Sequence, residues 1–537
     1  MNAPLAAPSL ARSRPRISVI GAGPGGLAAA MLLAASGARV TVHERDGVVG
    51  GRTRTVTAPG GYRFDLGPTF FLYPRILQEI FHRCGTAFES EVDLRRLDPQ
   101  YRLVFEGAQG EAHGVLDATP DVERMEAAIA GLCPKDAKGL RPFLAENRAK
   151  LQLFRPVLER AMSTAADLMR PDMLKALPML RPLRNVDADL ARHFSDPRVR
   201  LAFSFQTKYL GMSPFKCPAL FTILSFLEYE HGVFHPIGGC GAVSSAMARV
   251  AERIGVDVRL NAPVEEITFE GRRATGVATA SGHQAADAVV VNADFAGSMP
   301  KLIPDRVRRG RWRDRRIEDA RYSCSTFMLY LGVEGEFPEL AHHTILLAED
   351  YRTNIRQIET GELPEVPSLY LHHPGATDPT MAPPGHTSLY LLVPVPNMRS
   401  GIDWAATAAR YRDIALDRIR ALGLPDLRPL IRYEKMITPQ GWQDDLGIGF
   451  GATFNLSHDL GQMLCFRPGN RFREVEGVYL VGGGTHPGSG LPVIYEGARI
   501  TTGLIAQDLG LSTRPSRPTT AGDLTAATPA PAYGPER

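Results

Sequence analysis

A glycine-rich turn near the start of the chain has the spacing of a dinucleotide-binding motif. Gly21, Gly23 and Gly26 form the pattern G-x-G-x-x-G directly after the apolar run Ile17–Ile20. The first glycine permits a tight turn, the second lets backbone amides approach a pyrophosphate, and the third lets a helix pack closely against a sheet. Glu44 follows 18 residues after Gly26, where a carboxylate accepts hydrogen bonds from a ribose hydroxyl pair. We therefore predict a dinucleotide site.

The residues around this motif predict the strand–helix–strand unit that would position it. The run Ile17–Ile20 predicts a buried strand, the Ala/Leu-rich stretch over about 27–36 a helix, and Val40–Val42 a second strand that leads to Glu44. The helix N-terminus would present free N–H groups and a positive dipole end to the phosphates. Because all these parts occur in order, the sequence favours a cofactor site over a turn that is glycine-rich by chance.

Two further clusters follow shortly after Glu44. A glycine doublet offers a second close backbone approach to a ligand, and an adjacent arginine can offset pyrophosphate charge. A dinucleotide site of the NAD type does not need this second glycine cluster. The two clusters are Gly50-Gly51-Arg52 and Gly67-Pro68-Thr69.

A glycine-rich loop near the other end of the chain is also a candidate ligand loop. The run Val478–Gly482 predicts a strand, and residues 493–509 predict a helix. The main chain of the loop between them can approach a ligand closely, and the N-terminus of the helix can stabilise negative charge there.

Four motifs in this order resemble those of the bacterial-type phytoene desaturases, with their squalene and diapophytoene relatives, within the flavin amine oxidase superfamily. The doublet Gly50-Gly51 followed by arginine is one of them. Another is Leu210–Gly239, which has a small-residue turn, an apolar helix with an aromatic–acidic end, and Pro-x-Gly-Gly. The terminal loop matches Gly-x-x-Thr-His-Pro-Gly-x-Gly-x-Pro. The resemblance covers about residues 17–510.

This resemblance implies FAD as the cofactor and an α/β fold, a Rossmann-like FAD-binding domain of the amine oxidase/desaturase type with an inserted α+β substrate domain. It places the backbone of Val264 against the adenine and the terminal loop against the isoalloxazine. From the motifs and the resemblance together, the expected cofactor-binding residues are Gly21, Gly23, Gly26, Glu44, Gly50, Gly51, Arg52, Gly67, Pro68, Thr69, Val264, Gly483, Gly484, Thr485, Pro492 and Val493.

The order of these motifs predicts that the FAD-binding domain is assembled from three separated segments. The substrate domain would then be built from the insertions between them. The expected division is a disordered arm over 1–15, FAD-binding segments over 16–110, 231–300 and 436–510, substrate-domain segments over 111–230 and 301–435, and a disordered tail over 511–537.

The expected reaction is removal of hydride from carbon, because FAD accepts two electrons. Our main hypothesis is a desaturase that introduces double bonds into a long isoprenoid. An amine-oxidase-like flavoenzyme, and an isomerase or lipid-binding protein without net redox turnover, remain alternatives. His486 is a candidate for removing the proton or for electrostatic tuning, and equally for a structural role in its loop. Since no second nucleotide-binding turn for NADPH occurs, we expect oxygen or a membrane quinone as the electron acceptor.

The composition is that of an ordinary globular protein. The 537 residues are 44% hydrophobic, and a net charge of +3 does not indicate a nucleic-acid partner. Residues 1–15 lack the apolar core of a signal peptide, and no apolar run reaches the roughly 18–20 residues that span a bilayer. We therefore expect a cytoplasmic protein that at most lies on a membrane.

One stretch could provide such a membrane contact. Residues 150–186 are rich in leucine and methionine, and their basic residues outnumber the acidic ones. This pattern is typical of a segment that rests on anionic lipid, and also of core helices with solvated basic faces. Both interpretations stay open.

Neither the cysteines nor the histidines have the spacing of metal ligands. The six cysteines form no C-x-x-C pair, which predicts reduced thiols. His342-His343 and His372-His373 are adjacent pairs, and neighbours on a strand point to opposite faces. The sequence therefore predicts no metal site.

Overall fold

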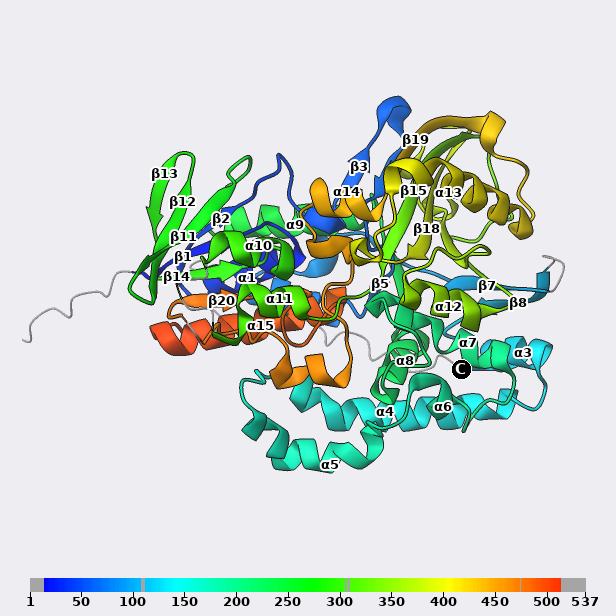
Figure 1. The fold of residues 1–537 in the computed structure, drawn as a ribbon, viewed down its shortest axis with the longest axis horizontal. Helices are drawn as coiled ribbons and strands as arrows, with labels where there is room; N and C mark the ends of the chain where they lie inside the picture. Colours follow the sequence, from blue (N-terminus) through cyan, green and yellow to red (C-terminus); the bar gives the residue numbers. More distant parts are fainter. Residues whose placement is uncertain (1–13, 108–111, 305–306, 308–309, 474, 513–537) are drawn as a thin grey trace, which may run out of the picture.

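The computed structural model describes residues 14–107, 112–304, 307, 310–473 and 475–512 (Figure 1). The predicted disordered arm and tail fall almost entirely outside these ranges. Within the described residues, no helix is both long and apolar enough to cross a membrane.

A five-stranded parallel sheet forms the centre of one half of the molecule, at the left of Figure 1. Its strands come from three regions far apart in the sequence, and the first strand lies in the middle. The strands are mostly buried valine, isoleucine and alanine, as expected of a parallel sheet covered on both faces. In spatial order they are β10 (Asp257–Arg259), β2 (Arg39–His43), β1 (Arg16–Ile20), β14 (Ala288–Val291) and β20 (Val478–Leu480).

Helix α1 (Pro24–Ala35) packs beside this sheet and is buried along nearly its whole length. It begins three residues before the predicted start at residue 27, because Pro24 occupies the first helical turn, where its missing N–H costs nothing. The helices that contact it are α2 (Arg75–Arg83), α9 (Cys240–Arg253) and α15 (Leu491–Leu509).

A small antiparallel sheet and two helices complete this half. Its three strands pair antiparallel with one another in chain order, as successive hairpins. Its strands are β11 (Val264–Glu270), β12 (Arg273–Thr279) and β13 (Gly282–Ala285), and the helices are α10 (Phe295–Leu302) and α11 (Asp314–Asp319).

A seven-stranded mixed sheet forms the other half, at the right of Figure 1. Its two long central strands pair antiparallel over ten residues each. In spatial order the strands are β19 (Ile431–Ile437), β15 (Ser325–Glu334), β18 (His386–Val395), β17 (Leu369–His372), β16 (His343–Leu347), β7 (Tyr101–Glu106) and β8 (Ala112–Ala118). The helices α12 (Tyr351–Thr360), α13 (Trp404–Arg418) and α14 (Pro439–Asp444) belong to the same part of the chain.

The boundary expected at residue 110, between the first FAD-binding segment and the first substrate-domain segment, lies too far along the chain. Residues 16–110 were assigned to the cofactor domain, but β7 belongs to the seven-stranded sheet, where it pairs parallel with β16. Leu103 and Phe105 are buried in the core cluster next to that sheet. Their alternating pattern predicts a strand, whereas the partner strand lies more than two hundred residues away in the sequence.

A mostly helical layer lies along the lower side of Figure 1. It is built from residues 122–231, most of the first segment expected for the substrate domain. Its helices are α3 (Val122–Leu132), α4 (Leu140–Leu158), α5 (Pro171–Leu180), α6 (Val186–Leu190), α7 (Pro197–Ala202) and α8 (Thr222–His231). Short connecting strands are β3 (Thr55–Thr57), β4 (Arg63–Asp65), β5 (Phe71–Leu72), β6 (Leu94–Arg96) and β9 (Val233–Pro236).

Candidate functional site

A cavity of about 790 Å³ extends between the two halves of the molecule. Its volume lies within the range of about 300–1,000 Å³ that small-molecule and cofactor sites occupy. One end is formed by the loops that follow the strands of the five-stranded sheet, and the other is lined by apolar side chains of the helical layer and the seven-stranded sheet. In open α/β sheets, ligands bind beyond the carboxyl ends of the strands, which is where this cavity begins.

Most of the predicted cofactor-binding residues meet at this cavity, although they come from distant parts of the chain. Those that line it are Gly21, Gly23, Glu44, Gly51, Arg52, Gly67, Pro68, Thr69, Val264, Gly483, Gly484, Pro492 and Val493, and the catalytic candidate His486 lines it as well. Gly26, Gly50 and Thr485 do not line it.

The position of Gly26 shows why it lies outside the cavity. A Cβ atom built on Gly26 would lie 2.1 Å from the carbonyl oxygen of Gly21, closer than any real contact. This glycine therefore lets α1 approach the turn.

Gly50 has a φ of +101°, and its N–H donates to the carbonyl oxygen of Ala22 at 2.8 Å, which joins the second glycine cluster to the first.

Glu44 is held at the end of β2 by two backbone amides. Its Oε2 accepts a hydrogen bond from the N–H of Ala22 at 2.7 Å, and its Oε1 accepts one from the N–H of Asp46 at 3.0 Å. The residue is only 6% exposed and lines the cavity. Each carboxylate oxygen retains a lone pair that can accept a ribose hydroxyl.

Asn292 is a cavity residue that our sequence reasoning did not assign. It follows β14 directly, and its Nδ2 donates to the carbonyl oxygen of Gly21 at 3.1 Å. A Cβ atom on Gly23 would come within 2.9 Å of that same Nδ2. Asn292 therefore braces the first glycine turn, and its position as the first polar residue after an apolar strand was the available signal.

Arg467 supports the terminal glycine loop from behind. It is fully buried, and its guanidinium donates to the carbonyl oxygens of Gly483 at 2.8 Å and Leu456 at 3.1 Å. Burial lowers its pKa to about 9. Because its hydrogen-bond partners are carbonyl groups, a largely uncompensated positive charge lies directly behind the loop. A negative charge that develops on the cavity side of Gly483 would be stabilised by it.

His486 is buried and tied to the helical layer. Its Nε2 donates to the carbonyl oxygen of Arg160 at 3.0 Å, and its Nδ1 has no hydrogen-bond partner among the described residues. Burial lowers its pKa to about 4, so the imidazole is neutral near pH 7. The hydrogen bond to Arg160 serves the structural role directly, and the free Nδ1 is the atom on which a role in proton removal would depend.

Protonation of His486 should make the protein acid-sensitive. Because the folded-state pKa lies below the ordinary value of about 6.5, the contribution of the neutral ring to stability is complete above about pH 6.5 and lost as the pH falls towards 4. The contribution at stake is roughly 3 kcal/mol. We expect the fall in thermal midpoint between about pH 7 and pH 5 to be about 2 °C smaller in His486→Gln than in the wild type. Exposed His283→Gln is the control, and an equal fall in all three proteins would contradict this.

A second buried histidine faces the cavity beside the terminal loop. His458 accepts a hydrogen bond at Nε2 from the N–H of Ser489 at 3.0 Å, and burial holds its pKa well below the ordinary range. This arrangement leaves the ring proton on Nδ1, which has no partner. In the sequence, His458 lies between Ser457 and Asp459, and this short segment is the only feature that could have pointed to it.

The far end of the cavity is apolar. Helix α8 contributes one face, with Leu224 and Leu227 half-buried towards the cavity, and α4 contributes Leu151 and Phe154. Lys208 adds a charged group to the lining; its pKa is lowered by burial, and its Nζ lies 6.0 Å from the centroid of the Tyr351 ring.

The fold and this cavity define a flavin-dependent oxidoreductase. A family model for flavin-containing amine oxidoreductases matches residues 24–501, and the chain belongs to that family. Solved structures support the same fold. Putrescine oxidase bound to putrescine has a TM-score of 0.58 at 17% identity and covers 92% of this chain and 99% of its own. An oxidoreductase from Methanosarcina mazei has a TM-score of 0.58, also at 17% identity.

Curated relatives narrow the position within the family. A 4,4'-diapophytoene desaturase (4,4'-diapolycopene-forming) of Methylomonas sp. is 42% identical over 91% of this chain and 95% of its own. An all-trans-zeta-carotene desaturase of Myxococcus xanthus is 39% identical over 94% and 95%, and a lycopene-forming phytoene desaturase of Pseudescherichia vulneris is 36% identical over 91% and 99%. The resemblance to the desaturase family, the fold class and FAD as the cofactor are thereby confirmed.

The residues at the cavity fit this cofactor. A carboxylate stands at the end of β2 for the ribose, two glycine turns leave room for close backbone approach, and the N-terminus of α15 faces the cavity through Pro492 and Val493. The individual contacts to FAD remain predictions.

Proposed function

We propose that this enzyme is an FAD-dependent desaturase that introduces double bonds into a long isoprenoid of the phytoene, squalene or diapophytoene type. The observation that carries the proposal is the continuity of the cavity, which joins the flavin loop to an apolar channel lined by α4 and α8. A hydrocarbon substrate offers no charged group to bind, and the side chains at this end of the cavity are mostly apolar. The relatives described above are named as desaturases of 4,4'-diapophytoene and zeta-carotene, which agrees with this substrate class.

Bound FAD supplies the acceptor for a hydride taken from carbon. The chain's own contribution is to hold the substrate in line and exclude water, which the apolar faces of α4 and α8 achieve. A proton must also leave the neighbouring carbon. We propose His486 for this step, through its unpartnered Nδ1, with Arg467 stabilising negative charge from behind the glycine loop. Oxygen or a membrane quinone is the proposed electron acceptor.

Expression in hosts that accumulate phytoene, squalene or 4,4'-diapophytoene, followed by pigment analysis, tests this function. New conjugated polyenes in one of these hosts would support desaturation and would identify the chain length. A geometric isomer without new double bonds would favour an isomerase instead. Unchanged isoprenoids together with peroxide released from amines would favour an amine oxidase and overturn the proposal.

We also propose that α5 and its flanking residues rest on a membrane surface. Apolar side chains are exposed here, with Met169 69% and Leu183 97% exposed. Basic Lys175 and Arg184 lie exposed among them. Helix α5 packs against α4, whose Leu151 and Phe154 line the apolar end of the cavity, so a substrate dissolved in lipid would enter beside this surface. Such apolar and basic surfaces are typical of interfacial segments.

Charged substitutions on this surface should release the protein from vesicles. We expect Leu174→Asp with Leu183→Asp to lower cosedimentation with anionic vesicles on the order of tenfold, because both apolar contact and electrostatic attraction are weakened. Val366→Asp, at an exposed site on another part of the chain, is the matched control. Equal vesicle binding by the double variant and the wild type would mean that this surface is ordinary exposed polypeptide.

A further inference from the structure

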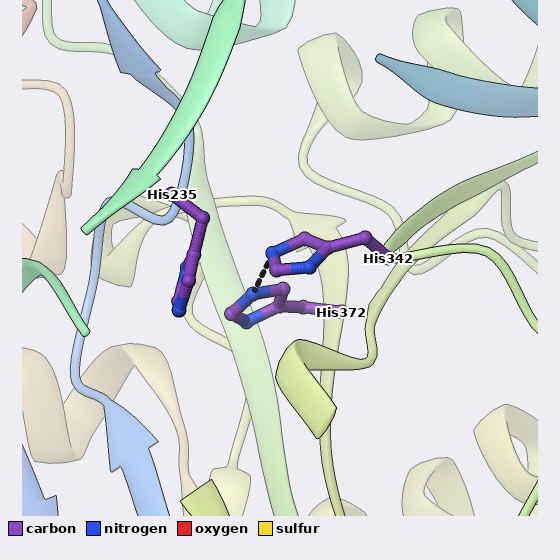
Figure 2. Close-up of side chains that lie close together, drawn as sticks. All are labelled: His235, His342 and His372. Atoms are coloured by element: carbon purple, nitrogen blue, oxygen red, sulfur yellow. Dashed lines mark hydrogen bonds between the residues drawn. The ribbon is translucent and has the colours of Figure 1, made fainter. Parts of the chain in front are cut away.

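Three buried histidines from separate parts of the chain converge behind the wall of the cavity (Figure 2). His235 lies on β9, His342 precedes β16, and His372 ends β17. One ring nitrogen of each lies within 4.8 Å of those of the other two. The exposed fractions are 0%, 5% and 1%, so water has little access to the cluster.

The cluster takes one histidine from each adjacent pair. Neighbours on a strand point to opposite faces, so neither pair by itself makes a site. However, β16 and β17 pair antiparallel with His343 opposite His372, and the N–H of His373 donates to the carbonyl oxygen of His342 at 2.8 Å. His342, which directly precedes β16, lies with its ring centroid 4.9 Å from that of His372, and His235 on β9 adds the third ring, 4.7 Å from that of His342. The prediction of no metal site considered each pair alone.

The distances suit a tetrahedral metal ion. The Nε2 atoms of His342 and His372 lie 3.1 Å apart. Two nitrogens bound to zinc at about 2.0–2.1 Å in tetrahedral geometry are separated by about 3.3–3.4 Å. Two of the three ligands are therefore already at nearly the required spacing, and only the ring of His235 needs a small movement inward.

Two of the three histidines have an outer partner of the kind that metal-bound histidines usually have, whereas the Nδ1 of His372 has none among the described residues. The Nε2 of His235 lies 3.2 Å from the Oδ2 of Asp378, and the Nδ1 of His342 lies 2.8 Å from the Oγ1 of Thr377. Such outer contacts set the tautomer and orient the other nitrogen towards the ion. The Nδ1 of His235 has no hydrogen-bond partner, although it is buried. The Asp378 carboxylate also accepts hydrogen bonds from the N–H of Gly238 at 2.6 Å and from the N–H of Thr380 at 2.9 Å, which hold it next to the cluster.

We propose that His235, His342 and His372 bind a divalent transition-metal ion of the zinc class. Neutral imidazole is the form that binds metal. Imidazole ligands suit zinc, copper, iron and nickel, whereas calcium and magnesium prefer oxygen.

The position of the cluster assigns the ion a structural role. The ring centroid of His372 lies 5.9 Å from that of Tyr390 and 6.4 Å from that of Tyr370. Tyr390 donates to the carbonyl oxygen of Gly67 at 2.8 Å, and the hydroxyl of Tyr370 lies 2.7 Å from the Oγ1 of Thr69. An ion at this point would join β9 to the seven-stranded sheet and support the tyrosines that hold the 67–69 cluster.

Metal analysis of the untagged FAD-loaded enzyme tests the proposal. We expect about one equivalent of metal per chain after growth with zinc, and at least a tenfold loss in both His235→Gln and His372→Gln. His113→Gln and His283→Gln, at exposed sites, should keep the full amount. One equivalent of another divalent transition metal would equally support the site. Less than about a tenth of an equivalent in the wild type would overturn it, as would full metal content in both cluster variants.

A second measurement covers the case in which the cluster variants fold poorly. Wild-type protein stripped by a chelator should bind Co²⁺ with one-to-one saturation, give the visible absorption of a nitrogen-coordinated tetrahedral ion, and regain its original thermal midpoint. Retained FAD absorbance shows that the stripped protein is still folded. A stripped, FAD-loaded protein that takes up no Co²⁺ and melts as before would refute the site without any substitution.

Discussion

Glu44→Ala is expected to leave the purified enzyme largely without FAD. The carboxylate accepts from the N–H groups of Ala22 and Asp46 at 2.7 and 3.0 Å, so alanine leaves both donors without this partner and removes the acceptor for the ribose. Hydrogen bonds to a charged group are each worth about 1.5–3 kcal/mol. The affinity for FAD should therefore fall on the order of 100-fold. The ratio of flavin to protein absorbance and a titration with added FAD measure this loss.

Two controls separate this effect from general damage. Glu44→Gln keeps one oxygen acceptor and should lose less FAD than Glu44→Ala. Glu252→Ala changes an exposed glutamate on α9 and should keep the full complement. Excess FAD should restore activity to Glu44→Ala if only binding is impaired. A fully loaded and active Glu44→Ala enzyme would show that the ribose lies elsewhere.

Leu224→Asp is expected to abolish desaturation while FAD stays bound. Leu224 lies on the face of α8 that lines the apolar end of the cavity, away from the glycine turns. A carboxylate here would have to lose its hydration when a hydrocarbon enters, at a cost of at least about 3 kcal/mol. Turnover of the isoprenoid should therefore fall by about 100-fold or more. Product analysis by chromatography measures turnover, and flavin absorbance reports the cofactor.

Two matched substitutions test whether the charge in the channel causes the loss of turnover. Leu224→Met keeps an apolar side chain of similar size and should retain most of the activity. Val366→Asp introduces the same charge at an exposed site and should have little effect. Wild-type turnover by Leu224→Asp would mean that the substrate does not pass along α8, and the proposed binding mode would be wrong.

Strands were predicted well where a single stretch of sequence carries the apolar pattern that marks them. The strand predicted over Ile17–Ile20 corresponds to β1, and the strand predicted over Val478–Gly482 corresponds to β20. Continuous apolar runs bounded by polar residues mark such strands clearly. Helix ends were less accurate, since α1 and α15 both begin two or three residues before their predicted starts. In each case a proline in the first turn extends the helix into the glycine loop.

Sheet membership was harder to predict than strand formation. The alternation in β7 predicts a strand, but its pairing with β16 depends on a segment more than two hundred residues away. Asn292 and Arg467 were missed as supports of the glycine turns for the same reason. Each hydrogen-bonds to a backbone carbonyl that only the folded chain brings within reach.

The sequence alone determined the dinucleotide-binding unit, because the glycine turn, the following helix and the acid at the second strand end all lie within about thirty residues and work as one unit. The resemblance of the further motifs to one family implied FAD and the fold class. The tertiary structure decided what lies at the other end of the cavity and behind its wall. The apolar channel requires α4 and α8 to face the flavin loop, and the histidine cluster requires β9, the residue before β16 and the end of β17 to come together. Such arrangements depend on long-range packing, which leaves no fixed spacing in the sequence.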